Sequence, residues 1–326
     1  MRTPRHWSPG HVVLPALLGP LGWLYGLAGQ ARRATANPVR APVPVICLGN
    51  ITAGGSGKTP ATLAVTAHLR ARGRTPHILT RGYGGSAKGP LRVDPNHTAR
   101  EVGDEAILLA RVAPTWIGAD RVETARFAVA AGADVLVMDD GFQNPHLIQD
   151  LSFLVVDGGF GLGNGRLIPA GPLRESPAQA LARATAVIYI VDPGGDAAGP
   201  PPPGIERVPV FPARLEPTPE AALLSDGPVV AFAGIGRPAK FFNTLRAMGL
   251  RVTDTYAYPD HHVFDPEELM MVIEDAVAAG AKVVTTEKDA VRLPPEARGM
   301  VEVLRVALQF DDPHALDTLL SPILDD

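Results

Sequence analysis

Residues 43–60 read VPVICLGNITAGGSGKTP and decide the fold. The apolar run at 43–48 is typical of a buried β-strand, and residues 60–72 predict a helix that ends before Gly73. A glycine-rich turn joins the two, which is the context that a phosphate-binding loop requires. Glycines let backbone N–H groups turn toward phosphate oxygens, and the N-terminus of the following helix adds its dipole.

We assign nucleotide binding to this loop and to the helix start that follows it. The assigned residues are Thr52, Ala53, Gly54, Gly55, Ser56, Gly57, Lys58 and Thr59. Lys58 would reach the β- and γ-phosphates of ATP, and the Thr59 hydroxyl would hold Mg²⁺. The match to G-x-x-x-x-G-K-[ST] is imperfect, because Thr52 stands where that pattern has glycine. The competing interpretation is a glycine-rich turn with an incidental lysine.

Strands and helices alternate along the rest of the chain. Further strands are expected at 77–80, 134–138, 152–156 and 186–191, and helices at 104–113, 121–131 and up to 184. Residues 192–204, rich in glycine and proline, predict a loop or linker. After it the alternation restarts, with strands at 229–233, 252–256 and 282–286 and helices at 239–248 and 266–279. Continuous apolar strands between helices indicate parallel sheets that are covered on both faces.

Charge is distributed unevenly along the 326 residues. Residues 1–93 hold no acidic residue and carry +12, whereas residues 94–326 carry −16. This asymmetry indicates an N-terminal region that meets phosphates, an anionic membrane or both. The net charge of −4 suggests no special affinity for nucleic acid. A single cysteine, Cys47, excludes an intramolecular disulfide and a zinc site built from cysteines.

Residues 11–29 are uncharged and mostly apolar. A secretory signal is opposed by the arginines at 32–33, which separate this run from the small-residue site at 34–36. A transmembrane helix needs about 20 apolar residues, a length that the run barely reaches and that prolines and a glycine interrupt. A helix packed on its own domain is a further possibility. We favour a membrane-surface anchor, with Trp23 and Tyr25 at the headgroup boundary.

Acidic and basic residues in later loops provide the remaining candidates. Asp139 and Asp140 follow an apolar strand, where carboxylates beside a P-loop hold Mg²⁺, although a solvated acidic turn would look similar. We expect one of them to face the metal and the other a hydrogen-bond network. Asp104 stands at a predicted helix start, where capping is an equal explanation, and His261 and His262 follow an aspartate in a loop.

Two basic turns are candidates for binding phosphate groups. Arg81 lies in a glycine-rich turn, and Arg174 precedes Glu175 in a loop punctuated by prolines. We assign phosphate or substrate contacts to the two arginines. Glu175 joins Thr59, Asp139 and Asp140 as a candidate metal ligand. Ordinary surface loops remain the competing interpretation.

These motifs in this order resemble the tetraacyldisaccharide 4'-kinases (lipid A 4'-kinases) of Gram-negative bacteria. The resemblance rests on GNITAGGSGKTP at 49–60, RGYG at 81–84, VGDE at 102–105, DDGFQ at 139–143, PAGPLRE at 169–175, PDH at 259–261 and TTEKD at 285–289. It runs from the apolar N-terminus to about residue 293. One departure is Asn144, where the family usually has histidine.

The resemblance implies transfer of the γ-phosphoryl group of ATP, with Mg²⁺, to the 4'-hydroxyl of tetraacyldisaccharide 1-phosphate, giving lipid IVA. It implies that Asp104 and His261 act together on the acceptor hydroxyl. We add Lys58, which would contact the phosphates, as the third catalytic residue. It also implies two α/β/α units at the cytoplasmic face of the inner membrane. The expected partners are a tetraacylated glucosamine disaccharide 1-phosphate and inner-membrane lipid, with no nucleic acid and no obligate protein partner.

The fold prediction is therefore an α/β protein, with a P-loop NTPase-like parallel sheet domain and a second, smaller α/β/α domain. We divide the chain into an apolar membrane-surface segment (1–40), a P-loop kinase domain (41–210) and the smaller domain (211–326), which contributes His261. Since His261 and Lys58 fall in different units, domain closure should assemble the site. The alternative functions are a membrane-associated P-loop ATPase without a lipid acceptor and a membrane-surface nucleotide sensor.

Overall fold

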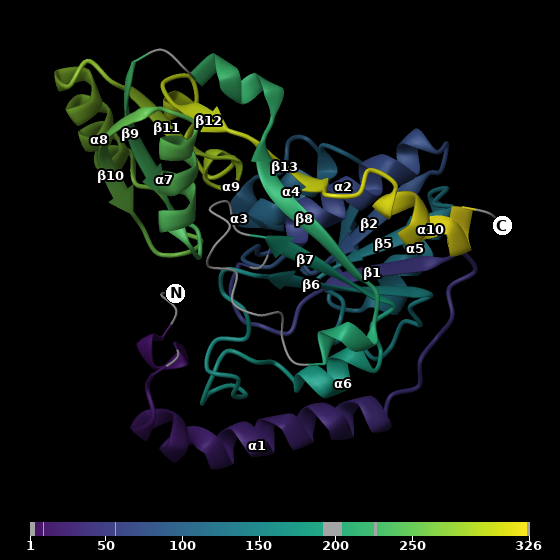
Figure 1. Cartoon of the computed structure of the whole chain (residues 1–326). Helices are drawn as coiled ribbons and strands as arrows, with labels where there is room; N and C mark the ends of the chain where they lie inside the picture. The colour runs from purple at the N-terminus through teal and green to yellow at the C-terminus, as the bar shows by residue number, and fades with distance from the viewer. Residues whose placement is uncertain (1–3, 9, 56, 192–203, 225–226, 325–326) are drawn as a thin grey trace.

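The computed structural model describes residues 4–8, 10–55, 57–191, 204–224 and 227–324, and it contains two sheets of unequal size (Figure 1). Ser56 and residues 192–203, which hold most of the predicted linker, lie outside the described residues. The expected α/β class, with a large sheet dominated by parallel pairs, is confirmed.

The larger sheet has nine strands in the order β13-β8-β7-β6-β1-β5-β2-β4-β3. Neighbouring strands from β8 to β4 are parallel, whereas β13 and β3 pair antiparallel at the two edges. The strands are β1 (Val45–Gly49), β2 (Pro76–Thr80), β3 (Leu91–Arg92), β4 (Thr115–Ile117), β5 (Val135–Asp139), β6 (Leu151–Asp157), β7 (Ala186–Val191), β8 (Val210–Pro217) and β13 (Val306–Phe310).

Helices cover both faces of this sheet, which explains why its central strands are apolar at consecutive positions. Every residue of β1, β2, β5 and β6 is buried. On one face, α2 (Lys58–Ala71), α4 (Asp104–Ala110) and α10 (Ala315–Leu324) contribute to the core. On the other face the core receives α5 (Arg121–Ala130) and α6 (Pro177–Leu181). The short helix α3 (Ala99–Val102) precedes α4.

The smaller sheet has four parallel strands in the order β10-β9-β11-β12. These are β9 (Pro228–Ala233), β10 (Arg251–Ala257), β11 (Lys282–Thr286) and β12 (Glu302–Leu304). Helix α7 (Pro238–Ala247) packs on one face and α8 (Pro266–Ala278) on the other. The remaining elements are α9 (Glu287–Ala290) and the 3₁₀-helices η1 (Arg5–Trp7), η2 (Ile205–Arg207), η3 (Pro219–Leu224) and η4 (Pro295–Ala297).

The chain returns from the smaller sheet to the larger one near its end. Strand β13 pairs with β8 at the edge of the larger sheet, and Leu319 and Leu320 of α10 belong to that sheet's core. Residues 211–326, assigned to the smaller domain from the sequence, therefore contribute to both sheets.

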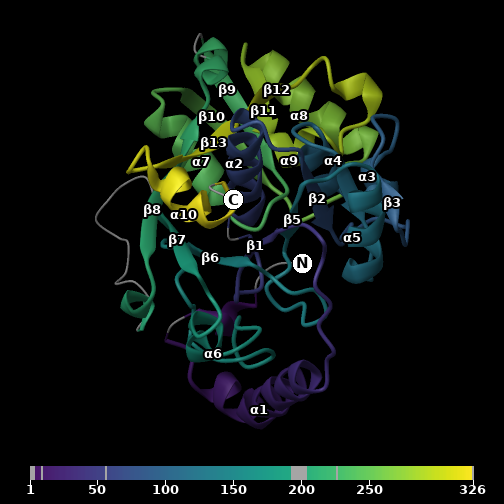
Figure 2. The ribbon, with the colours of Figure 1, turned by 90° about the vertical axis from the view of Figure 1, so that its right-hand side faces the viewer.

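Helix α1 (Val13–Ala34) lies along the outside of the molecule beside α6 (Figures 1 and 2). It packs through small residues: a Cβ added at Gly22 would lie 3.0 Å from the carbonyl oxygen of Leu167. Its large apolar side chains are left outside, with Leu17 71%, Trp23 64% and Leu24 54% exposed. Among the described helices, none is both long enough and apolar enough to cross a bilayer.

Candidate active site

The glycine-rich loop leaves the larger sheet at the carboxyl end of β1. Strand register places Leu48 beside Asp139 of β5 and Gly49 beside Leu154 of β6, so the loop emerges between these two strands. Gly57 ends the loop with a φ of +77°, and a Cβ there would lie 2.2 Å from Cδ1 of Ile190. The left-handed backbone and the close approach both favour glycine at this position. Helix α2 then begins at Lys58.

Asp140 lies among cations at the start of this helix. Its Oδ1 is 3.6 Å from Nζ of Lys58, and Nη1 of Arg174 donates to Oδ1 and Oδ2 at 3.0 and 3.1 Å. Burial alone would raise the pKa of Asp140, but Lys58 and Arg174 outweigh it and hold this pKa below its ordinary value. The carboxylate is therefore ionised beside the phosphate-binding loop.

Asp139 points instead into the protein. It is buried, and its Oδ1 accepts a hydrogen bond of 2.9 Å from the hydroxyl of Thr62 on α2. Burial raises the pKa of Asp139 to about 7, and the negative charges of Glu105 and Asp140 add to the shift. The two adjacent carboxylates thus differ in environment: Asp140 faces cations and Asp139 faces a buried hydroxyl.

Asp104 and His261 are 157 residues apart and meet between the two sheets. Nδ1 of His261, in the loop after β10, lies 3.0 Å from Oδ2 of Asp104, the first residue of α4. Oδ1 of Asp104 accepts from the backbone N–H of Glu105 at 2.9 Å, so the carboxylate also serves the helix start. Burial would raise the pKa of Asp104, but the hydrogen bond from His261 and the charges of Lys288 and Arg292 lower it overall.

In the described part of the chain, two non-glycine residues have positive φ, and both lie in this region. They are Asp140 at +51° and His261 at +59°. Aspartate and histidine adopt the left-handed conformation more readily than most residues. Such backbone conformations concentrate at functional sites, where the surrounding structure holds them.

Two cations that follow β11 in the chain lie beside this pair. Nζ of Lys288 lies 3.1 Å from Oε1 of Glu105 and 3.4 Å from Nε2 of His261. Nη1 of Arg292 lies 3.5 Å from Oδ2 of Asp104. The sequence motif TTEKD at 285–289 supports the family resemblance but predicts no role for Lys288, because the partners of Lys288 lie on distant segments of the chain.

Glu175 is surrounded by protein donors. It is 2% exposed, and Nη2 of Arg183 reaches its two oxygens at 3.0 and 2.9 Å. Nε2 of Gln143 donates to Oε1 at 3.1 Å, and Nη1 of Arg33 from α1 lies 3.4 Å from Oε2. Gln143 also accepts from Arg174, so Glu175 is linked to the Asp140 pair through one side chain.

Three other positions singled out in the sequence occupy different surroundings. Arg81 is exposed after β2 and forms no ion pair with the described residues. His262 lies 2.6 Å from Oε2 of Glu268 and stacks on Tyr258, so it belongs to the smaller sheet's packing. Oδ1 of Asn144 accepts from the backbone N–H groups of residues 146 and 147, which caps the turn after DDGFQ.

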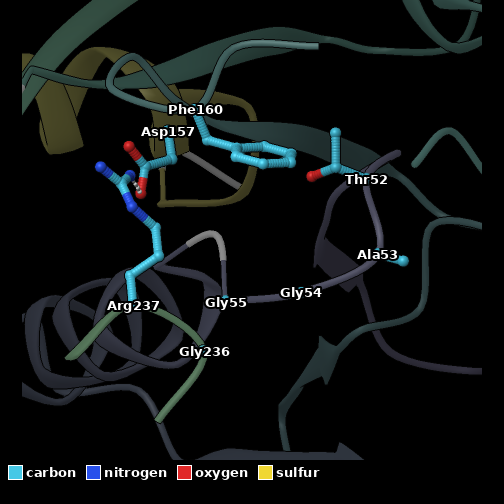
Figure 3. A pocket seen from close by; sticks show the side chains of 8 residues that line it. All are labelled: Thr52, Ala53, Gly54, Gly55, Asp157, Phe160, Gly236 and Arg237. Atoms are coloured by element: carbon cyan, nitrogen blue, oxygen red, sulfur yellow. Dashed lines mark hydrogen bonds and ion pairs between the residues drawn. The ribbon is translucent and has the colours of Figure 1, made fainter. Parts of the chain in front are cut away.

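A pocket lies between the glycine-rich loop and the end of β6 (Figure 3). Its lining residues are Thr52, Ala53, Gly54, Gly55, Asp157, Phe160, Gly236 and Arg237. Nη1 of Arg237 donates to Oδ2 of Asp157 at 2.8 Å, which joins the start of α7 to the end of β6. Sequence reasoning missed both residues. We call the smaller sheet with α7, α8 and α9 the smaller lobe, and the larger sheet with its helices the larger lobe. A Cβ at Gly236 would lie 3.2 Å from the backbone nitrogen of Gly55, so the smaller lobe approaches the loop closely.

The donor set fits a Mg²⁺–nucleotide rather than a metal held by the protein alone. Within the described ranges, no three His, Cys, Asp or Glu residues are placed to hold a metal ion. Mg²⁺ is usually bound by one or two carboxylates together with substrate phosphates. An ionised Asp140 beside Lys58 and the start of α2 meets that requirement.

Comparison with known proteins gives a consistent result. The sequence profile of the family described as tetraacyldisaccharide-1-P 4'-kinase (LpxK) matches residues 14–325. A protein named tetraacyldisaccharide 4'-kinase from Gluconacetobacter diazotrophicus is 54% identical, covering 100% of this chain and 99% of the relative. Its namesake from Rhodospirillum centenum is 51% identical, covering 99% and 97%. The crystal structure of LpxK from Aquifex aeolicus in complex with ATP is 27% identical with a TM-score of 0.76, covering 96% of this chain and 100% of that one.

Proposed function

Because this chain belongs to the tetraacyldisaccharide-1-P 4'-kinase family, we propose that Asp104 is the group that accepts the proton of the acceptor hydroxyl. The enzyme transfers the γ-phosphoryl group of ATP to the 4'-hydroxyl of tetraacyldisaccharide 1-phosphate, a step of lipid A biosynthesis. The membrane-associated ATPase without a lipid acceptor is not favoured, since the relatives are named as kinases. One observation carries the assignment of the base, namely the contact between Asp104 and His261.

The reaction needs a base because a sugar hydroxyl is a poor nucleophile at neutral pH. Phosphoryl transfer depends mainly on positioning and on neutralisation of charge, with a carboxylate accepting the hydroxyl proton. Asp104 is ionised, and His261 and Arg292 hold its Oδ2 in place. His261 orients this carboxylate, and its own contact with Asp104 already joins the two lobes.

The opposite side of the site binds the nucleotide. The loop glycines Gly54, Gly55 and Gly57 offer backbone N–H groups to the phosphates. Lys58 and Arg174 supply positive charge. We assign Mg²⁺ to Thr59 and Asp140, and give Asp139 and Glu175 structural roles within their hydrogen-bond networks. When bound, Mg²⁺ neutralises charge on the phosphates. We place the rest of the nucleotide on the side of residues 52–55 where this pocket opens (Figure 3).

The enzyme works at the cytoplasmic face of the bacterial inner membrane, with α1 lying in the surface of the bilayer. Support comes from the apolar side chains that α1 leaves outside, followed by the exposed Arg32 in its last turn. Such a helix binds an anionic interface through apolar burial and basic residues. The acceptor, a tetraacylated glucosamine disaccharide 1-phosphate, is an anionic lipid of that interface, and no obligate protein partner is required.

Phosphoryl transfer from labelled ATP, measured with and without the lipid acceptor, tests this function. Asp104→Ala should lower turnover by about 10²–10⁴, the scale of a lost general base, while ATP affinity stays nearly intact. Asp254→Asn, at an exposed position of β10, is the matched control and should keep normal turnover. An equal loss of ATP affinity in Asp104→Ala would contradict the assignment, and ATP turnover independent of lipid would favour the ATPase.

A further inference from the structure

Lys288 presents an ammonium group to the side of His261 that faces away from Asp104. Its Nζ lies 3.4 Å from Nε2 of His261, while Nδ1 of the same ring lies 3.0 Å from Asp104. Burial would lower the pKa of Lys288, but Glu105, Asp104 and Asp260 outweigh it and raise this pKa. The side chain is therefore cationic at neutral pH.

A lysine ammonium has three donors and no acceptor. A ring nitrogen that faces it within hydrogen-bond distance must therefore carry a lone pair. At 3.4 Å, Lys288 can donate to Nε2 of His261 in the tautomer that carries its ring proton on Nδ1. That proton is the one donated to Oδ2 of Asp104.

We propose that Lys288 is a positioning residue that fixes His261 as the neutral tautomer with its proton on Nδ1, a role that rests on the proposed function of Asp104 as proton acceptor. A neutral imidazole orients the carboxylate by one hydrogen bond. An imidazolium would form an ion pair with Asp104 and make it a weaker base. Lys288 thus keeps the base effective at neutral pH.

The charges around the ring show why this lysine is needed. His261 faces Asp104 from α4, Asp260 of its own loop at 3.9 Å, Lys288 from α9 and the ring of Tyr83 at a centroid distance of 5.3 Å. Just outside this set, Glu105 contacts Lys288 and Arg292 contacts Asp104. Without Lys288, Arg292 would be the one cation left among the described groups named here, and the carboxylates would favour the protonated ring.

The fold holds Lys288 firmly in this place. Thr286 caps α9 by accepting from the backbone N–H of Asp289 at 3.1 Å. Asp289 is itself fully buried and accepts from the backbone N–H of Gly234 at 3.0 Å. Because the turn is tied to β9 in this way, the ammonium does not depend on a flexible loop for its position.

Nitrogen-15 NMR of the full chain with labelled histidine reports the tautomer directly, and His261→Gln identifies the signal. We expect the wild-type protein to show His261 neutral and protonated on Nδ1 at pH 7. Lys288→Met should convert this signal to the imidazolium form, whereas Lys288→Arg should retain the neutral ring. Lys282→Met is the matched control: Lys282 pairs with Glu302 at 2.9 Å in the same sheet, and its removal should leave the signal unchanged.

The pH dependence of kcat/KM for the lipid acceptor gives a second readout. Removal of a charge this close shifts titrations by about 1–3 units, so the acid limb of Lys288→Met should move up by at least one unit with ATP affinity unchanged. A wild-type ring protonated on Nε2, or a Lys288→Met variant with both the NMR signal and the pH profile of wild type, would overturn the proposal. Full turnover in Asp104→Ala would overturn the proposed function instead, because the tautomer would still be as described.

Discussion

Replacement of Glu175 by glutamine removes a buried negative charge that holds together three segments of the larger lobe. The carboxylate accepts two hydrogen bonds from Arg183, at 3.0 and 2.9 Å, and one from Gln143 at 3.1 Å, and it lies 3.4 Å from Arg33. Loss of one partner of a buried ion pair costs about 3–5 kcal/mol. Arg183 and Arg33 are 34% and 22% exposed and regain water when the charge is lost. We therefore expect Glu175→Gln to lower the free energy of unfolding by about 2–3 kcal/mol.

Urea unfolding at pH 7, without nucleotide or metal, measures this loss. The matched control is Asp311→Asn, which breaks the surface pair between Arg214 and Asp311, whose side chains are 48% and 39% exposed. Exposed pairs contribute about 0–1 kcal/mol, so the control should unfold near the wild-type midpoint. The reasoning is refuted if Glu175→Gln costs less than about 1 kcal/mol while it raises the Mg²⁺ concentration needed for turnover. That combination would make Glu175 a metal ligand rather than a structural anchor.

Two further predictions concern pH and the membrane. The folded pKa of Asp139 is about 7 against an ordinary 3.8, so the folded state keeps a proton that the unfolded chain loses between these values. The protonated carboxyl therefore contributes its full stability below pH 3.8, and this contribution is lost as the pH rises to about 7. Between pH 5 and 8, the urea midpoint of metal-free Asp139→Asn should fall less than the midpoint of the wild type. Parallel curves for the two proteins would contradict the raised pKa of Asp139. The double variant Leu17→Asp, Leu24→Asp changes two exposed positions that lie two turns apart on α1. It should lower binding to anionic vesicles, measured by sedimentation, by at least about tenfold while the stability of the protein stays unchanged. Undiminished binding would show that α1 is not the anchor.

The fold was predictable wherever burial on both faces leaves consecutive apolar residues. Strands β1, β5, β6 and β7 were expected within a residue or two of their bounds because helices cover them on each side. Short or mixed strands gave no such signal: β13 reads VALQF and buries only Leu308, and β4 has only three residues. Their positions depend on pairing with β8 and β2, which local sequence does not specify.

The site residues that the sequence predicted are likewise those that follow apolar strands, and the residues that it missed have partners on distant segments. The glycine-rich loop and the Asp139–Asp140 pair are local signals, because both follow apolar strands whose carboxyl ends meet at one edge of the sheet. Glu175 was expected near a metal, yet its partner Arg33 comes from α1, 142 residues earlier in the chain, and no local pattern encodes that contact. Lys288 and Arg292 were not predicted as site residues for the same reason, since their partners Glu105 and Asp104 lie on α4.

The proposed proton acceptor, Asp104, depends on contact between the two lobes for both its burial and its charge. Asp104 sits on α4 of the larger lobe, whereas His261, Lys288 and Arg292 all come from segments around the smaller sheet. Burial of a carboxylate without compensating partners would favour its neutral form, which cannot accept a proton. The same contact that excludes water from Asp104 therefore supplies the donor and the cations that keep it ionised. A separated pair of lobes would leave Asp104 solvated but without His261 to orient it, so we expect the proposed base to be effective only where the lobes meet.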